Sequence, residues 1–132
     1  MNQYLLDTNI CIYFLGGKFN LIDLLETIGI SNCFISEITL AELKYGVENS
    51  IHKEKNQEIL DQFSTKFTII PIFNCLDVYA KEKARLKKQG RLLDDFDLLI
   101  GATAIKNGLI LATRNVSDFN RLDGIEIIDW TK

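Results

Sequence analysis

Short apolar runs alternate with helical patterns along the whole chain, and this alternation restricts the fold more than any other feature. Five runs too short for helices predict strands at residues 4–6, 33–35, 67–70, 109–112 and 125–128. Apolar residues at helical spacing, with capping or breaking residues at the ends, predict helices at 10–15, 21–28, 39 to about 46 or beyond, 54–63, 76–89, 98–106 and 116–122. Such a pattern is typical of α/β proteins.

The predicted strands are too apolar to have a face in water. A mainly parallel sheet of about five strands, covered by helices on both sides, is therefore expected. The 132 residues, 47% of them hydrophobic, with no repeat or linker, form one domain spanning 1–132. A chain of this length buries roughly two-thirds of its unfolded surface, so it can fold without disulfides or a structural metal.

Cysteine, histidine and N-terminal composition exclude several classes of protein. The three cysteines are widely spread and never form a Cys-x-x-Cys pair, which argues against a disulfide framework or a zinc site. The single histidine, His52, lies in a polar stretch without a nucleophile partner. The first apolar run is interrupted by Asp7 and Asn9, so it is neither a signal peptide nor a membrane span. A reduced, cytoplasmic protein that does not enter membranes is expected.

Four acidic residues follow strands or open helices, where ligands bind in parallel α/β sheets: Asp7, Glu42, Asp97 and Asp118. Each also has a purely structural explanation, because acidic residues are favoured in the first turn of a helix. Asp7 and Asp97, however, have apolar neighbours, and an ionised carboxylate there is costly unless it is paired or binds a metal. If the four converge, an oxygen-only set favours Mg²⁺ or Mn²⁺. Such an ion suits phosphodiester hydrolysis.

A run of basic residues between 81 and 91 precedes the acidic stretch that contains Asp97. On a helix these charges spread around the circumference, which favours a solvated face. The alternative is that Lys87, Lys88 and Arg91 contact RNA phosphates, although the net charge of −3 argues weakly against binding through the overall field.

Taken together, the motifs resemble those of the PIN-domain ribonucleases of the VapC toxin family. The resemblance spans the whole chain and rests on these segments: Leu5-Leu6-Asp7-Thr8-Asn9-Ile10, Thr39-Leu40-Ala41-Glu42-Leu43 with Tyr45-Gly46, Gly90-Arg91, Asp95-Phe96-Asp97-Leu98-Leu99-Ile100-Gly101-Ala102, Thr113-Arg114-Asn115-Val116-Ser117-Asp118-Phe119 and Asp129-Trp130. It implies a PIN-like three-layer α/β/α sandwich. It also implies the toxin of a type II toxin–antitoxin pair, a Mg²⁺-dependent endoribonuclease that inhibits translation and growth, with Mn²⁺ as a possible substitute.

The same resemblance implies roles for individual residues. Asp7, Glu42 and Asp97 match the three near-invariant acids of the family, and Asp7 and Asp97 are the expected principal metal ligands. Family members place the fourth acid at the position of Asn115 or of Asp118; Asp118 is favoured here, with Asn115 orienting ligands or water. We expect in-line hydrolysis that leaves a 5′-phosphate and a 3′-hydroxyl. Thr8 and Thr113 are expected to support the site.

The expected partners are the RNA substrate, a VapB-type antitoxin whose tail covers the acidic groove, and a second copy in a homodimer. Two other functions are open. One is a phosphatase with Asp7 as nucleophile, although Asn9 stands where that chemistry needs a second acid. The other is a non-catalytic module that binds RNA or antitoxin, in which the acids only cap helices.

Overall fold

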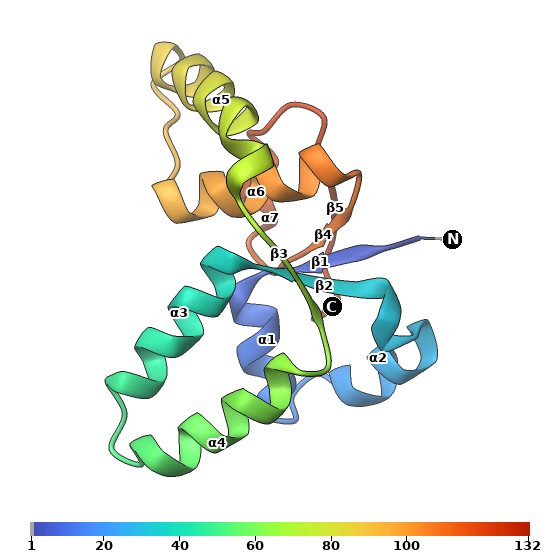
Figure 1. Cartoon of the computed structure of the whole chain (residues 1–132). Coiled ribbons are helices and arrows are strands. Elements are labelled where there is room, and N and C mark those ends of the chain that lie inside the picture. Colours follow the sequence, from blue (N-terminus) through green and yellow to red (C-terminus); the bar gives the residue numbers. More distant parts are fainter. Residues whose placement is uncertain (1) are drawn as a thin grey trace.

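Five parallel strands form the central sheet of the computed structural model, which describes residues 2–132 (Figure 1). The strands are β1 (Tyr4–Leu6), β2 (Cys33–Ser36), β3 (Thr68–Ile70), β4 (Ile110–Ala112) and β5 (Glu126–Ile128). Their order across the sheet is β3-β2-β1-β4-β5, and every neighbouring pair is parallel. The predicted strands and the parallel α/β fold are confirmed.

Helices connect all of the strands. They are α1 (Thr8–Leu15), α2 (Leu21–Ile28), α3 (Glu37–Glu48), α4 (Lys53–Ser64), α5 (Leu76–Lys88), α6 (Asp95–Asn107) and α7 (Val116–Phe119), with short 3-10 helices η1 (Ile30–Asn32) and η2 (Phe73–Cys75). The 3-10 helices were not predicted, because three residues carry no periodic pattern. The helix predicted at 116–122 is shorter than expected and gives way to a turn after Phe119.

Helices cover both faces of the sheet, as Figure 1 shows, with α1, α2 and α4 on one side and α5, α6 and α7 on the other. Consecutive residues of β1 belong to opposite cores, because side chains alternate along a strand: Leu6 packs with the first group and Leu5 with the second. Both side chains are fully buried. The predicted three-layer architecture is therefore confirmed.

The start of α3 differs from the prediction that Thr39 and Glu42 form a capping box. The helix begins two residues earlier, at Glu37, because the Ser36 hydroxyl at the end of β2 accepts a hydrogen bond from the Ile38 amide at 3.0 Å and caps it. Thr39 is instead fully buried inside the helix. Glu42 consequently lies in the second turn, with its side chain free to serve another purpose.

The direction of the connections reverses between β1 and β4. The chain adds β2 and β3 on one side of β1, then returns to add β4 and β5 on the other. In open α/β sheets, ligands bind at such a reversal, beyond the carboxyl ends of the strands. Here the ends of β1 and β4 are joined by a hydrogen bond from the Asp7 amide to the Ala112 carbonyl at 2.9 Å.

The three cysteines are buried and unpaired, and the Trp130 ring packs on Tyr4 with centroids 5.0 Å apart, as expected for core residues and a C-terminal anchor. Across residues 2–132, the helices are all too short or too polar to span a bilayer.

Candidate active site

Asp7 is the most deeply buried acidic side chain at the reversal point. It follows β1 and caps α1: its Oδ1 accepts a hydrogen bond from the Thr8 amide at 2.8 Å, and its Oδ2 accepts one from the Thr113 hydroxyl at 2.8 Å. Only 5% of the residue is exposed. The start of α1 and the residue that follows β4 therefore each hold one oxygen of the Asp7 carboxylate, although the two segments are far apart in the sequence.

Glu42 reaches the same region from α3. Its Oε1 accepts a hydrogen bond from the Thr8 hydroxyl at 2.6 Å, and the Thr8 and Thr39 hydroxyl oxygens are hydrogen-bonded at 3.1 Å. Thr8 thus connects the two acids, with its amide on Asp7 and its hydroxyl on Glu42. The early start of α3 explains this geometry, because Thr39 and Glu42 lie three residues apart and share one helix face.

Asp97 lies in the first turn of α6 and is the least restrained of the acids. Within the described part of the chain it has neither an ion pair nor a side-chain hydrogen bond. Burial raises its pKa to about 6, and the negative charges of Asp7 and Glu42, among others, add to this effect. Burial also raises the pKa of Asp7, against the hydrogen bonds from Thr113 and Thr8. The region carries more negative charge than the protein itself balances.

A single cleft of about 580 Å³ brings these side chains together. Its lining includes three of the predicted acids and two of the predicted supporting residues: Asp7, Glu42, Asp97, Thr8 and Asn115. Thr113 lies behind Asp7, fully buried. The acids share the cleft without forming a closed ligand set, since no three acidic, histidine or cysteine side chains among residues 2–132 are grouped closely enough to hold an ion alone.

Asp118 does not line this cleft, although it was the favoured fourth acid. Its Oδ1 is 3.2 Å from Nη2 of Arg121, and its Oδ2 accepts a hydrogen bond from Nδ2 of Asn115 at 2.9 Å. Asp118 and Arg121 are three residues apart, so this ion pair is local, and the charge of Asp118 still contributes to the raised pKa of Asp97. Asn115 is the residue of this pair that reaches the cleft wall.

The predicted RNA contacts lie elsewhere. Lys87 and Lys88 are exposed in the last turn of α5, Arg91 is exposed just after it, and none of the three lines the cleft. The sequence interpretation missed Tyr45 and Phe96, two exposed aromatic residues in the lining. Their positions were available as signals, since Tyr45 is three residues after Glu42 on α3 and Phe96 precedes Asp97.

Comparison with known proteins finds a family pattern, relatives and solved structures that match nearly the whole chain. The PIN domain pattern matches residues 4–125. The chain is 36% identical to Ribonuclease VapC2 of Rickettsia felis, covering 98% of each, and 31% identical to the tRNA(fMet)-specific endonuclease VapC of Salmonella typhimurium, covering 98% of this chain and 99% of the relative. It also superposes on a chain of the DNA-bound VapBC crystal structure from Salmonella typhimurium with a TM-score of 0.91, at 31% identity, covering 98% of this chain and 99% of that one.

Proposed function

Because the chain belongs to the VapC family of PIN-domain proteins, we propose that it is a Mg²⁺-dependent endoribonuclease and the toxin of a type II toxin–antitoxin pair. Cleavage of RNA needed for translation would inhibit growth. The observation that carries the proposal is the cleft that gathers Asp7, Glu42 and Asp97 at the reversal point of the sheet, with no basic side chain in its lining. Relatives named ribonuclease or endonuclease have the same fold and length.

A divalent cation fits the donors of this cleft. They are carboxylate, amide and hydroxyl oxygens, which suit Mg²⁺ or Mn²⁺ rather than softer ions. The absence of a closed ligand set among the described residues also suits Mg²⁺, which usually keeps several waters and takes only one or two carboxylates from the protein. Asp7 and Asp97 are the residues that would hold it. When bound, the cation would supply charge for the phosphodiester transition state and favour hydroxide near neutral pH.

The surrounding residues orient the acids. The Thr8 amide and the Thr113 hydroxyl fix the Asp7 carboxylate, so that it cannot rotate away from the cleft. The Thr8 hydroxyl does the same for Glu42, whose second oxygen can orient a water for in-line attack on phosphorus. Asp118 holds the Asn115 amide at the cleft wall, which makes Asp118 a positioning residue in this mechanism. The expected products carry a 5′-phosphate and a 3′-hydroxyl.

An antitoxin tail also fits the surface. An apolar groove of about 350 Å³ between α1, α3 and α4 shares Ile12 and Glu42 with the acidic cleft. A peptide with apolar side chains followed by a basic one would fill both, placing its positive charge among the acids. A VapB-type partner is consistent with the VapBC complexes of the structural relatives. A homodimer and a cytoplasmic location remain parts of the proposal; sedimentation and cell fractionation measure them.

RNA cleavage by purified protein tests the proposal. The wild type should cut RNA in Mg²⁺ and leave it intact in EDTA, and Asp7→Asn should reduce cleavage to the uncatalysed level while keeping the fold. Asp23→Asn, an exposed acid in α2, is the matched control and should cut like the wild type. Full cleavage in EDTA, or by Asp7→Asn, would contradict the proposal. RNA that is bound but never cut by the wild type would indicate the non-catalytic alternative.

A further inference from the structure

An arginine and two aromatic rings form a compact surface cluster beside the cleft. The guanidinium carbon of Arg114 is 5.5 Å from the ring centroid of Phe19 and 5.9 Å from that of Tyr13. The two rings meet nearly edge to face, with centroids 5.0 Å apart, and Nη1 of Arg114 is 3.4 Å from the Tyr13 hydroxyl. We call Arg114, Tyr13 and Phe19 the arginine–aromatic cluster.

The cluster adjoins the acidic cleft on two elements. Arg114 directly precedes Asn115, which lines the cleft. Tyr13 follows Asn9, another lining residue, by four positions on α1, so the two lie one turn apart on the same helix face. A flexible chain bound in the cleft would therefore reach the cluster with its next units.

Backbone strain indicates that Phe19 is held for a purpose. Its φ of +56° lies in the left-handed region, which a bulky side chain rarely adopts, and Asn20 follows with the same φ. Such a conformation is unfavourable for a non-glycine residue and tends to persist where function requires it. Although Phe19 packs on Tyr13 and Arg114, it remains 40% exposed, so part of its ring is accessible to a ligand.

The charge of the cluster distinguishes between possible ligands. Arg114 is exposed and makes no ion pair within the described residues. Its charge helps to lower the pKa of Asp129 at longer range, and its guanidinium remains open to a ligand. A basic peptide tail would be repelled by it, whereas a nucleic-acid phosphate would be attracted. Exposed aromatic rings and the plane of a guanidinium are the surfaces on which unpaired RNA bases stack.

We propose that the arginine–aromatic cluster is a binding subsite for single-stranded RNA, in which a base stacks on Phe19 and Arg114 while the neighbouring phosphodiester lies in the cleft. The inference rests on the proposed nuclease function and adds the form of its substrate: an unpaired strand, with the base beside the cut site recognised by its face. Its charge and ring contacts would also draw RNA towards a cleft that otherwise repels phosphate.

Binding of a labelled single-stranded RNA to an Asp7→Asn parent, in Mg²⁺, tests this subsite without cleavage. Phe19→Gly removes the ring and relieves the backbone strain, so the fold should be retained; thermal unfolding checks this. Its affinity should fall roughly 5- to 100-fold, which is the range expected for one stacked base. Phe73→Ala, which removes a 79% exposed ring in η2, is the matched control and should bind within twofold of the parent.

Two further measurements separate stacking from a structural effect. An oligonucleotide with abasic sugars should bind Phe19→Gly and the parent equally, because it has phosphates but no base to stack. Arg114→Ala should reduce the slope of log affinity against log salt by about 0.7, the value for one phosphate of a single strand, whereas Phe19→Gly should leave the slope unchanged.

The outcomes distinguish the subsite from the nuclease function. Parent-like RNA affinity in both Phe19→Gly and Arg114→Ala would overturn the subsite, while Mg²⁺-dependent cleavage by the wild type would still support the nuclease. If these variants lose affinity only for an antitoxin-tail peptide, the cluster is a protein contact and the subsite is also overturned. If RNA affinity falls as expected but the wild type never cuts RNA, the subsite stands and the nuclease proposal fails.

Discussion

Buried carboxylates occur in two regions of this protein, around Glu82 and in the acidic cleft, and within residues 2–132 only the first region has arginine partners. Glu82 of α5 is buried and forms two hydrogen bonds with Arg85, at 2.8 and 3.0 Å, while its Oε1 accepts a third from the Asp123 amide at 2.7 Å. Hydrogen bonds from Arg85 are the main reason that the pKa of Glu82 is lowered. In the acidic cleft, burial instead raises the pKa values of Asp7 and Asp97.

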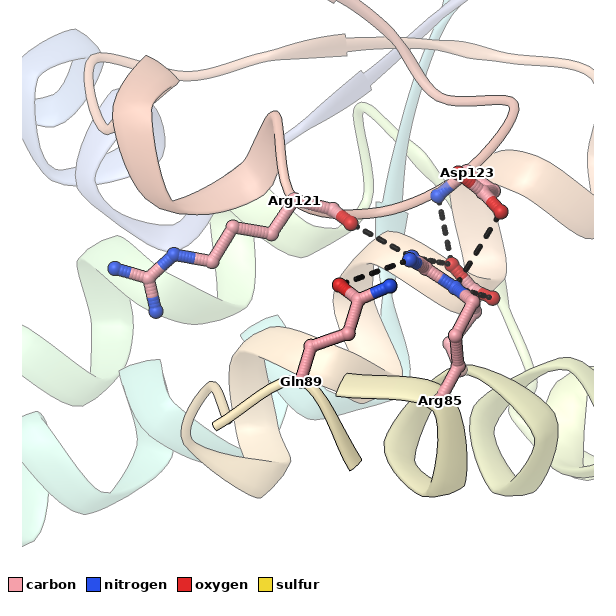
Figure 2. A network of polar contacts seen from close by, with 5 residues as sticks. Arg85, Gln89, Arg121 and Asp123 are labelled. Carbon is pink, nitrogen blue, oxygen red and sulfur yellow. Dashed lines mark hydrogen bonds and ion pairs between the residues drawn. The ribbon is translucent and has the colours of Figure 1, made fainter. Parts of the chain in front are cut away.

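Figure 2 shows the polar contacts that Arg85 makes in the first region. Arg85 also donates to the Arg121 carbonyl at 2.7 Å and pairs with Asp123 at 3.3 Å, so that α5 is joined to the loop before β5. The fold therefore contains arginines able to neutralise a buried acid, and none of them is directed at Asp7 or Asp97 among the described residues. We infer that the negative charge of the cleft is left unbalanced by the protein and can be balanced by a cation from solution.

Removing the guanidinium should have the largest effect on stability. Arg85→Met leaves Glu82 buried without its counter-charge, and the free energy of unfolding should fall by about 3 kcal/mol. Lys87→Met, at an exposed position on the same helix, is the matched control and should change it by less than about 0.5 kcal/mol. Urea unfolding measures both. Equal stabilities of the two variants would show that the Glu82 network contributes little.

Adding a cation should stabilise the folded protein by binding in the acidic cleft, and not at the Glu82 network. Mg²⁺ at ten times its dissociation constant should raise the free energy of unfolding of the wild type by about 1.4 kcal/mol, because it binds the native state. Arg85→Met should show the same increment from its lower baseline, since its site is separate from the cleft. Asp7→Asn should show none. An equal increment in Asp7→Asn, measured by thermal unfolding, would place the cation elsewhere.

Removing one cleft charge should have the smallest effect, with a sign opposite to that of Arg85→Met. In EDTA at pH 7, Asp97→Asn should raise the free energy of unfolding by about 1 kcal/mol, after allowance for its partial exposure. The folded-state pKa of Asp97, about 6, exceeds the ordinary aspartate pKa of 3.8, so between these pH values the folded state holds an extra proton. Wild-type stability should therefore decrease relative to Asp97→Asn as pH rises through about 4 to 6.

The stability difference between the wild type and Asp97→Asn should itself depend on pH. Below about pH 3 the wild type and Asp97→Asn should differ little, because Asp97 is then largely protonated in both the folded and the unfolded state. A difference that does not change between pH 4 and pH 7 would mean that Asp97 carries no unbalanced charge. Glu82 contributes the opposite trend, since its lowered pKa adds stability above about 4.5 that is lost on acidification, and it contributes equally to both proteins.

The sequence predicted most of what depends on local pattern. All five strands and the position of Asp7 follow from short apolar runs that end abruptly, and Trp130 was correctly taken as an anchor. The start of α3 was mistaken because Ser36 and Thr39 are both good caps. Only the end of β2 decides between them, and strand ends are poorly defined by composition.

The sequence pattern could not predict which side chains are hydrogen-bonded or ion-paired in the folded protein. Asp118 contacts Arg121 and Asn115, and of these residues only Asn115 lines the cleft. Glu82 lies within the basic run between 81 and 91, and its contact with the Asp123 amide, 41 residues away, could not be predicted from that pattern. Thr8 was named only as a supporting residue, and the structure gives it hydrogen bonds to two of the three acids in the cleft.

The hydrogen bond between Asp7 and Thr113 spans 106 positions, and it has a consequence for the order in which the protein is made. A ribosome that has released the first hundred residues has already synthesised every acid lining the cleft, but not β4, which lies beside β1 and carries Thr113 at its end. The nascent chain thus holds its reactive parts unassembled until synthesis is almost complete. Under the proposed function, the ribonuclease would therefore become complete only when its own synthesis is nearly finished.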